Sequence, residues 1–237
     1  MSSIPIRQAA LLVGGRGTRL GSLTETMPKP LAPVAGRPFL DWQIEDVARY
    51  GVTRITLLAG YKAEQIVDRY AGRTVLGATL EVLVEPEPLG TAGAIRLFAD
   101  RFDDTFFLMN GDTLFDVDLH DLPLRTHGAV ATLALRRTAP GGRYGTVDLA
   151  PDGRVTGFLP RSPDRDGPIN GGIYAMDRRI VDWIGPGAVS MEADVFPRLA
   201  EAGLLRGALY DGAFIDIGIP EDLERAQTLI PDMQRGK

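Results

Sequence analysis

The sequence predicts an α/β fold with a mixed, mostly parallel central sheet flanked by helices and a β-rich insertion in its second half. Short apolar runs alternate with amphipathic stretches through the first half, which is the pattern of βαβ units. The second half has short strand-like runs joined by Gly/Pro-rich loops that leave little room for helices. The 237 residues are 44% hydrophobic and 24% charged, as in a globular protein with its own core.

The first half alternates strands with helices. Residues 9–13 (AALLV) are continuously apolar and end at glycine, as a buried strand does. Residues 39–50 have apolar side chains at helical spacing and end before Gly51, a plausible C-terminal cap. The same two patterns then repeat. We expect strands over 54–60, 80–85 and 105–112, and helices over 63–70 and 91–98.

The second half begins with strands that follow one another directly. We expect strands over 129–135, 145–149, 154–158 and 169–176, then helices over 191–202 and 220–230. The last residues, DMQRGK, are expected to be frayed. Because no internal repeat or linker divides the chain, we expect a single domain over 1–237.

The composition excludes several classes of protein. The chain has no cysteine, which excludes disulfides, thiolate metal sites and cysteine nucleophiles and fits a reducing compartment. The N-terminal apolar run is too short for a signal peptide, and no segment approaches the roughly 20 apolar residues that span a membrane. The net charge of −5 without a basic stripe argues against nucleic acid. We expect a cytoplasmic protein that acts on small molecules, with no nucleic-acid or membrane partner.

The segment LLVGGRGTRL (residues 11–20) opens an apolar run into a glycine loop. Glycines let backbone N–H groups approach a phosphate closely. The loop lacks the Lys-Ser/Thr of a P-loop, and Leu20 replaces the third glycine of a dinucleotide fingerprint. Arg16, Arg19 and Lys29 would repel one another unless anions matched them, and two prolines stiffen the backbone of Lys29. These cations indicate a bound triphosphate. If the glycine loop is considered without them, the alternative is a glycine turn that binds no ligand.

The chain resembles the sugar-1-phosphate nucleotidyltransferases in six blocks: GGRGTRL…PKPLAPVAGRPFLDW, EPEPLGTAGAI, NGDTLFDVDL, RYGTVDL, NGGIY and DGAFIDIGIPEDLERA. The blocks keep the family's order over nearly the whole chain. The resemblance implies a GT-A/Rossmann-like fold, with a nucleoside triphosphate and a sugar 1-phosphate as substrates, Mg²⁺ as cofactor and pyrophosphate as product. It also implies that residues 1–128 mainly bind the nucleotide and 129–237 mainly the sugar phosphate.

The resemblance assigns roles to the charged residues. Arg19 would hold the leaving pyrophosphate and Lys29 the α-phosphate, and with Asp112 they are the expected catalytic residues. The attacking sugar phosphate is already an anion, so the reaction needs alignment and charge neutralisation rather than a base. Asp112 and Asp216 follow buried strand-like runs and would bind Mg²⁺. The nearby acids of the DVDL segment, Asp116 and Asp118, are expected to be structural, capping the helix that follows.

The glutamates of VEPEPLGTAG favour GTP. Glu85 or Glu87 can accept hydrogen bonds from two adjacent donors of guanine, whereas thymine and uracil present one N–H between acceptors. The alternative is that both are solvated loop residues. The expected nucleotide-binding residues are Leu12, Gly14, Gly15, Gly17, Thr18, Arg19, Glu85, Glu87, Gly90 and Thr91.

The sugar-phosphate side departs from the family pattern. Where many relatives have Phe-x-Glu-Lys, this chain has FLPR, with Pro160 and Arg161 in the Glu and Lys places. Proline cannot bond a sugar hydroxyl, which argues against an ordinary glucose-1-phosphate thymidylyltransferase, whereas arginine keeps the charge. The expected substrate-binding residues are Asn110, Gly145, Arg161, Asn170 and Gly171.

The blocks look most like those of the D-glycero-D-manno-heptose 1-phosphate guanylyltransferases. This implies GDP-heptose synthesis for capsule or surface polysaccharide, with a homo-oligomer (dimer or tetramer) by analogy. The alternatives within the family are a mannose-1-phosphate guanylyltransferase and a glucose-1-phosphate thymidylyl- or uridylyltransferase. A non-catalytic regulatory subunit that binds nucleotide sugars is the alternative from another class; the retained metal carboxylates argue against it.

Overall fold

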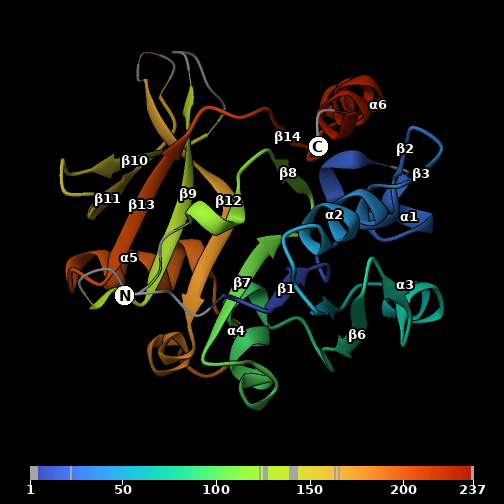
Figure 1. Cartoon of the computed structure of the whole chain (residues 1–237), viewed down its shortest axis with the longest axis horizontal. Helices are drawn as coiled ribbons and strands as arrows, with labels where there is room; N and C mark the ends of the chain where they lie inside the picture. The colour runs from blue at the N-terminus through green and yellow to red at the C-terminus, as the bar shows by residue number, and fades with distance from the viewer. Residues whose placement is uncertain are drawn as a thin grey trace. The chain divides into compact units, whose positions relative to one another are not determined.

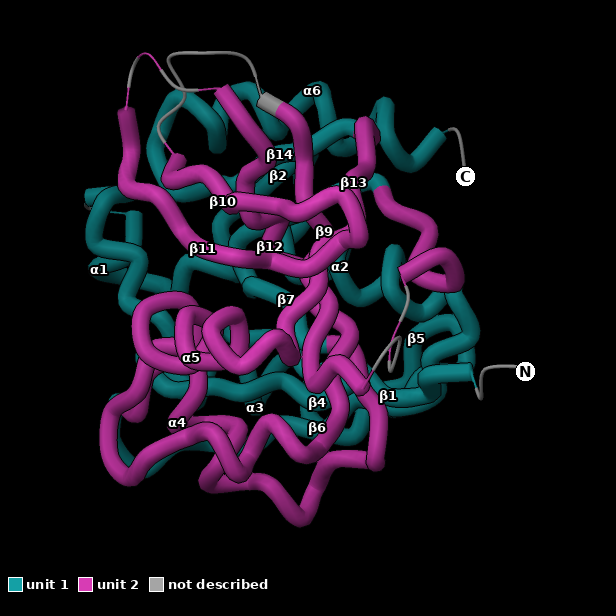
Figure 2. The backbone as a smooth tube through the Cα atoms, turned by 90° about the vertical axis from the view of Figure 1, so that its left-hand side faces the viewer, with its two compact units in different colours: residues 1–88, 108–116, 213–237 teal, residues 89–107, 117–212 magenta. Residues whose placement is uncertain are grey.

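The structure is a computed structural model that describes residues 5–21, 23–122, 124, 128–138, 144–162, 164 and 166–235 (Figure 1). The chain forms two compact units, each made of segments that are distant in sequence (Figure 2). Unit 1 comprises Met1–Pro88, Leu108–Asp116 and Ala213–Lys237, and unit 2 comprises Leu89–Phe107 and Val117–Gly212. Strand β7 (Thr105–Asn110) contributes residues to both. The single domain expected over 1–237 stays a prediction.

Unit 1 is built on parallel strands. Strand β1 (Gln8–Leu12) lies between β7 and β4 (Arg54–Ala59), and β4 pairs with β6 (Ala78–Val84). Strand β5 (Thr74–Val75) runs antiparallel to β6. Because β1, β4 and β6 run in the same direction, their carboxyl ends meet at one edge, where ligands of α/β proteins bind.

Helices and short turns flank these strands. The α-helices are α1 (Leu23–Thr26), α2 (Phe39–Ala48), α3 (Ala63–Tyr70) and α6 (Pro220–Arg235), and the 3₁₀ turns are η1 (Thr18–Leu20) and η2 (Lys29–Leu31). Two antiparallel pairs complete the unit: β2 (Pro33–Val34) with β3 (Arg37–Pro38), and β8 (Thr113–Phe115) with β14 (Phe214–Asp216). Helix α3 has the expected bounds, and α2 begins at the expected residue.

A buried apolar cluster in unit 1 joins three segments that are far apart in sequence. Ile215 and Ile217 are both fully buried on either side of Asp216, and Leu114 lies two residues after Asp112. Burying a side chain of this size contributes about 1.5–3 kcal/mol, so the cluster fixes the segments that carry both carboxylates. Its buried members are Ala32, Val34, Phe39, Leu114, Ile215, Ile217, Ala226, Ile230 and Met233.

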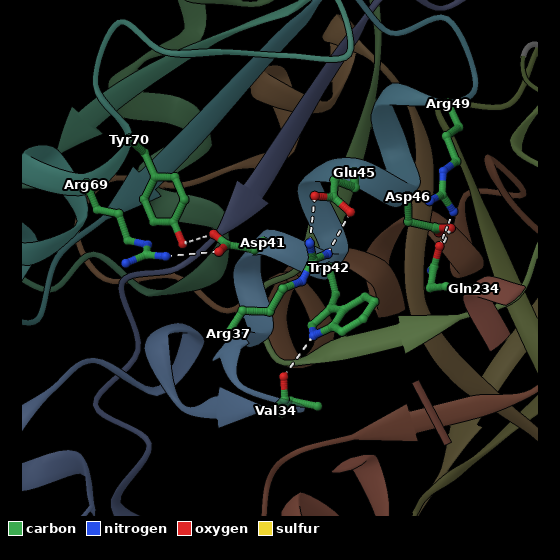
Figure 3. A network of polar contacts seen from close by, with 10 residues as sticks. All are labelled: Val34, Arg37, Asp41, Trp42, Glu45, Asp46, Arg49, Arg69, Tyr70 and Gln234. Atoms are coloured by element: carbon green, nitrogen blue, oxygen red, sulfur yellow. Dashed lines mark hydrogen bonds and ion pairs between the residues drawn. The ribbon is translucent and has the colours of Figure 1, made fainter. Parts of the chain in front are cut away.

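The carboxyl-terminal helix is longer than the sequence led us to expect. The prediction that DMQRGK is frayed is wrong up to Arg235, where α6 ends; residues 236 and 237 lie outside the described part. Met233 is 8% exposed within the apolar cluster, and Gln234 Nε2 donates to Asp46 Oδ1 of α2 at 3.2 Å (Figure 3). Figure 1 shows α6 beside the β2–β3 hairpin, where Gln227 Nε2 donates to Pro33 O at 2.9 Å. These tertiary contacts hold the last turns.

Unit 2 is rich in β-structure, as expected for the second half of the chain. Strand β12 (Gly167–Asp177) pairs antiparallel with β9 (Ala131–Thr138) and β10 (Thr146–Leu149); β11 (Val155–Leu159) pairs with β10, and β13 (Leu205–Tyr210) joins β9 in parallel. The other elements are α4 (Gly90–Leu97), η3 (Ala99–Arg101), η4 (Leu119–Asp121), η6 (Arg178–Trp183), η7 (Met191–Val195) and α5 (Phe196–Glu201).

The helix expected over 191–202 is divided into two parts in unit 2. Residues of η7 form a π-helical turn capped by Ser190, whose Oγ accepts from Ala193 N at 3.1 Å. The α-helix α5 begins after it, with Pro197 in its first turn, where a missing N–H costs nothing. No helix among the described residues is long and apolar enough to span a membrane.

Candidate active site

Lys29 and Asp112 form an ion pair in unit 1. Lys29 Nζ lies 2.5 Å from Asp112 Oδ2, with the lysine side chain 9% exposed and the aspartate side chain 34% exposed. Lys29 begins η2 between Pro28, which is extended, and Pro30. The two prolines restrict the backbone that carries the ammonium group, as the sequence predicts. The pair therefore joins the turn η2, which its prolines stiffen, to Asp112, two residues after the end of β7.

Asp216 reaches the same region from a third segment. Strand β14 pairs with β8, so Asp216 lies opposite Thr113, the residue after Asp112. The backbone N–H of Gly218 donates to Asp216 Oδ1 at 2.9 Å. A Cβ at Gly218 would lie 2.7 Å from Asp216 Oδ1 and 3.6 Å from Lys29 Nζ. The ammonium group and both carboxylates therefore gather around one turn.

The two carboxylates near Lys29 could hold a divalent cation such as Mg²⁺. Mg²⁺ is commonly held by one or two carboxylates together with phosphate oxygens and water, rather than by a complete protein cage. Asp112 and Asp216 provide such carboxylates. Asn110 Oδ1, at the end of β7, is buried and accepts no hydrogen bond from any residue that the structure describes. Over the described ranges, no group of three or more His, Cys, Asp and Glu side chains is arranged as a metal site.

The glycine loop packs against Lys29. Gly17 has φ 63°, and a Cβ there would lie 2.8 Å from Lys29 Cβ. Glycine is therefore needed at this position both for the left-handed backbone and for the space that the lysine occupies. At Gly15, by contrast, a Cβ would meet nothing within 4 Å. Thr18 and Arg19, both in η1, are exposed on the loop.

Two residues that the sequence reasoning missed hold this loop. The Tyr61 backbone N–H donates to Gly14 O at 3.0 Å, and its hydroxyl donates to Thr24 O at 2.9 Å. Thr24 Oγ1 in turn donates to Gly21 O at 3.1 Å. The Arg16 guanidinium lies 5.8 Å from the centre of the Tyr61 ring, within cation–π range. A tyrosine directly after the glycine that ends a predicted strand is the signal that could have identified this contact.

Glu85 and Glu87 have different surroundings. Glu85 is partly buried, and its Oε1 lies 2.8 Å from the place of a Cβ on Gly14 and 3.6 Å from that on Gly60. Its backbone N–H donates to Ala59 O at 2.8 Å, which continues the pairing of β4 and β6 by one residue. Glu87 is exposed. Of the two carboxylates, Glu85 is therefore the one held against the start of the glycine loop.

The expected nucleotide-binding residues of unit 2 have structural contacts of their own. Gly90 has φ 73°, and a Cβ there would lie 2.5 Å from Val189 O. Thr91 Oγ1 donates to Glu192 Oε2 at 2.9 Å and accepts from Met191 N at 2.8 Å. These contacts join α4 to the π-helical turn η7.

Asn170 bridges an irregularity in β12, where the register against β9 shifts. Its Oδ1 accepts from Gly172 N at 3.0 Å, and its Nδ2 donates to Tyr174 Oη at 2.9 Å. The other expected sugar-phosphate residues of unit 2 are Gly145, which directly precedes β10, Arg161, which is exposed after β11, and Gly171, which is buried within β12.

The structure thus brings Lys29, Asp112 and Asp216 together and sets Glu85 against Gly14. Asp118 caps η4 by accepting from the backbone N–H of the residue two positions later, which confirms its expected structural role. Unit 2 has a surface depression that is lined by none of the expected site residues. Its lining includes Asp104, Asp177, Arg178 and Arg179.

Comparison with known proteins gives three findings. Residues 8–232 match the family described as nucleotidyl transferase. D-glycero-alpha-D-manno-heptose 1-phosphate guanylyltransferase of Aneurinibacillus thermoaerophilus is 37% identical over 224 residues, which cover 93% of this chain and 96% of that protein. Mannose-1-phosphate guanylyltransferase of Mycobacterium tuberculosis is 36% identical over 235 residues, covering 96% of this chain and 65% of that protein. The crystal structure of HddC from Yersinia pseudotuberculosis complexed with GMP-PN superposes with a TM-score of 0.83 at 30% identity, covering 98% of this chain and 100% of that one.

Proposed function

Because the chain belongs to the nucleotidyl transferase family, we propose that it transfers the guanylyl group of GTP to D-glycero-α-D-manno-heptose 1-phosphate. The products are GDP-heptose and pyrophosphate. The observation that carries the proposed reaction is the gathering of Lys29, Asp112 and Asp216 around one turn of unit 1. The similarity to a heptose 1-phosphate guanylyltransferase over nearly the full length of both chains supports the choice of substrate.

The reaction is a displacement at the α-phosphorus of GTP. A phosphate oxygen of the sugar forms the new bond to phosphorus, the bond to the β-phosphate bridging oxygen breaks, and pyrophosphate leaves with the electron pair. Since the nucleophile is already an anion, the protein aligns the two polyanions and neutralises the charge that develops. Lys29 neutralises the α-phosphate oxygens, and Arg19 neutralises the leaving pyrophosphate.

Asp112 and Asp216 would hold Mg²⁺, and Asn110, whose buried side-chain oxygen accepts no hydrogen bond from the described residues, is a proposed substrate-binding residue. The ion would neutralise phosphate charge as a Lewis acid. Thr113 Oγ1 donates to Asp112 Oδ1 at 3.0 Å, while Asp112 Oδ2 faces Lys29. The two carboxylate oxygens are therefore held by different partners, which fixes the orientation of the carboxylate plane.

Glu85 is the proposed base-reading residue. An ionised carboxylate accepts hydrogen bonds only, so it complements the adjacent N1–H and amino donors of guanine. Its partial burial against Gly14 supports Glu85 over the exposed Glu87. A partly desolvated carboxylate discriminates better than an exposed one, because water competes less for its oxygens.

In unit 2, Gly145, Arg161, Asn170 and Gly171 are the proposed sugar-phosphate residues. Arg161 supplies positive charge, and the neighbouring Pro160 provides no side-chain hydrogen bond to a sugar hydroxyl. We place the reaction in the cytoplasm, within one nucleotidyltransferase domain, and its product in the assembly of capsule or surface polysaccharide. A dimer or tetramer of identical chains is the proposed assembly, and light scattering measures it.

Mannose 1-phosphate is the second candidate acceptor. The mannose-1-phosphate guanylyltransferase of Mycobacterium tuberculosis has nearly the same identity to this chain as the heptose enzyme has. The alignment, however, covers 65% of the mannose enzyme and 96% of the heptose enzyme. The heptose stays the first candidate because a heptose 1-phosphate guanylyltransferase is the more similar of the two, at 37% against 36% identity, and the acceptor screen separates them.

A pyrophosphate-release assay tests the proposal. GTP, UTP, dTTP and CTP are each combined with heptose, mannose and glucose 1-phosphates in the presence of Mg²⁺. We expect the highest kcat/KM for GTP with the heptose. Turnover of UTP with glucose 1-phosphate, without turnover of GTP with the heptose, would overturn the proposal, and no release from any pair would support the non-catalytic alternative.

A further inference from the structure

Gln43 is a polar residue on the buried face of α2. Its helical neighbours on that face are Leu40, Ile44 and Val47, which are 0%, 1% and 2% exposed, and Gln43 itself is 4% exposed. An amide in such surroundings is unfavourable unless it is hydrogen-bonded. The sequence signal is an interruption of the apolar stripe of this helix by one glutamine.

The side chain of Gln43 spans the turn that carries Asp112. Gln43 Nε2 donates to Asn110 O at 2.9 Å and to Thr113 O at 2.5 Å. These two carbonyls flank the dipeptide Gly111–Asp112. The Gln43 side-chain amide therefore donates one hydrogen bond before the aspartate and one after it. Both bonds lie within unit 1.

Other backbone contacts restrain the same turn from different directions. Gly111 N donates to Leu12 O at 3.0 Å, at the end of β1, and Ile217 N donates to Asp112 O at 2.9 Å, after β14. Gly111 leaves no room for a Cβ against Leu12 O. The contacts from Leu12 and Ile217 are made by the backbone, whereas those from Gln43 are made by a side chain of a helix. The Gln43 hydrogen bonds hold the residues on both sides of Asp112.

The other atom of the Gln43 amide indicates why glutamine is present. Gln43 Oε1 is buried and accepts no hydrogen bond from the part of the chain that the structure describes. Flipping the amide would point this oxygen at two carbonyl oxygens, so the observed orientation is the favourable one. Methionine would fill the same space without a buried polar atom. Packing of α2 therefore does not explain the glutamine, whereas the two bonds to the Asp112 turn do.

We propose that Gln43 is a positioning residue for Asp112, which it holds in the orientation that the divalent cation requires. The inference rests on the proposed function, because Asp112 is assigned to the cation there. Gln43 acts through the turn, because its Nε2 donates to the backbone carbonyls of Asn110 and Thr113. Removing its two donors loosens the turn, so the cation binds more weakly, while contacts to the base and the sugar keep their strength.

The test compares Gln43→Met with Gln8→Met. Gln8 is also a fully buried glutamine of unit 1, and its Nε2 donates to Thr56 Oγ1 at 3.2 Å, at the opposite end of β1 from the glycine loop. We measure turnover against Mg²⁺ concentration, and Mn²⁺ binding by electron paramagnetic resonance in the presence of GTP alone. Outer-sphere changes of this kind weaken metal affinity about 10–100-fold. We expect a loss in that range for Gln43→Met, partial rescue by high Mg²⁺, and unchanged metal affinity for Gln8→Met.

Two further arms separate the possible failures. In an Asp112→Asn background, Gln43→Met should weaken Mn²⁺ binding by less than threefold, because the two residues act as one unit. Two results would overturn the inference: an equal effect of Gln43→Met in both backgrounds, or unchanged metal affinity in Gln43→Met. If the wild-type protein is active, the proposed function stands in either case.

Gln43→Glu is the second variant if Gln43→Met does not fold. Loss of folding in both variants would show that the role of Gln43 is structural and would overturn the positioning role. Wild-type protein that binds Mn²⁺ with GTP but releases no pyrophosphate counts against the proposed function alone.

Discussion

Lys29 Nζ lies 2.5 Å from Asp112 Oδ2, so the cation assigned to the phosphate and a carboxylate assigned to the metal contact each other directly. The Lys29 side chain is only 9% exposed, so the attraction within the pair is largely offset by the cost of removing the ammonium group from water. The pair is therefore a weak element of stability. Replacement of Lys29 leaves a carboxylate that is one-third exposed to water, so it should act on turnover far more than on the free energy of unfolding.

Replacement of Lys29 should lower turnover with little effect on folding. We expect Lys29→Met to reduce kcat about 10²–10³-fold, or about 2–4 kcal/mol, because a preorganised positive charge on the reacting phosphate is lost. Steady-state pyrophosphate release measures this, and a urea titration monitors the free energy of unfolding. Lys62→Met is the matched control, because it removes a lysine that has no assigned role at the phosphates. Lys62 lies at the N-terminus of α3, with its Nζ 5.6 Å from the Tyr61 ring centre. A kcat within threefold of wild type in Lys29→Met would contradict the role assigned to this lysine.

Replacement of Asp112 tests the metal assignment. Asp112→Asn keeps the shape of the side chain but removes its negative charge, so Mg²⁺-dependent kcat should fall about 10²–10³-fold. The Mg²⁺ concentration for half-maximal rate should rise as well. Asp118→Asn is the control, because asparagine serves as well as aspartate at the cap of η4. Wild-type turnover of Asp112→Asn in Mg²⁺ would refute the assignment.

Substitution of Glu85 should lower the activity with GTP, whereas substitution of Glu87 should leave it almost unchanged. Glu85→Gln presents one acceptor and one donor, so it satisfies one of the two guanine donors and opposes the other. A lost charged hydrogen bond is worth about 1.5–3 kcal/mol, and kcat/KM for GTP should fall about 10–100-fold. Glu87→Gln, at an exposed position, should change kcat/KM less than threefold. If Glu87→Gln lost the GTP preference instead, the carboxylate assigned to the base would be the wrong one.

Tyr70 makes the stability of unit 1 sensitive to alkaline pH. Its hydroxyl donates to Asp41 Oδ1 at 2.6 Å, and Arg69 Nη2 donates to Asp41 Oδ2 at 3.0 Å (Figure 3). Burial, followed by the hydrogen bond to Asp41, raises the pKa of Tyr70 far above the ordinary tyrosine value. The unfolded chain therefore loses this proton near pH 10 while the folded chain keeps it. The stabilisation by Tyr70 is complete below pH 10 and decreases above it, by about 1.4 kcal/mol per pH unit.

Tyr70→Phe tests this dependence. We expect the variant to be less stable by about 1–3 kcal/mol at pH 7, because Asp41 loses a donor. The free energy of unfolding, measured in urea between pH 8 and 11, should converge for wild type and variant as the pH rises above 10. Parallel curves over the whole range would show that Tyr70 ionises equally in both states.

The family and the fold class followed from local patterns in the chain. The motif GGRGTRL…PKP and the later blocks predicted the nucleotidyltransferase family, which the match over residues 8–232 confirms. The alternation of strands and helices predicted the α/β fold, which the superposition on HddC confirms. Helix 63–70 has the expected bounds, because its apolar spacing is complete within its own sequence. The roles of the individual site residues stay predictions.

The sequence by itself determined the periodic elements, the glycine loop and the chemical types at the site, since these depend on residues close together in the chain. Only the tertiary structure decided which polar groups meet. Lys29, Asp112 and Asp216 come together because Ile215, Ile217 and their apolar partners bury the segments that carry them. Helix α6 continues to Arg235 because other segments cover its last turns, and Gln43 reaches the Asp112 turn only after α2 has packed. Burial and hydrogen bonding between distant segments are properties of the packed chain, and no local pattern encodes them.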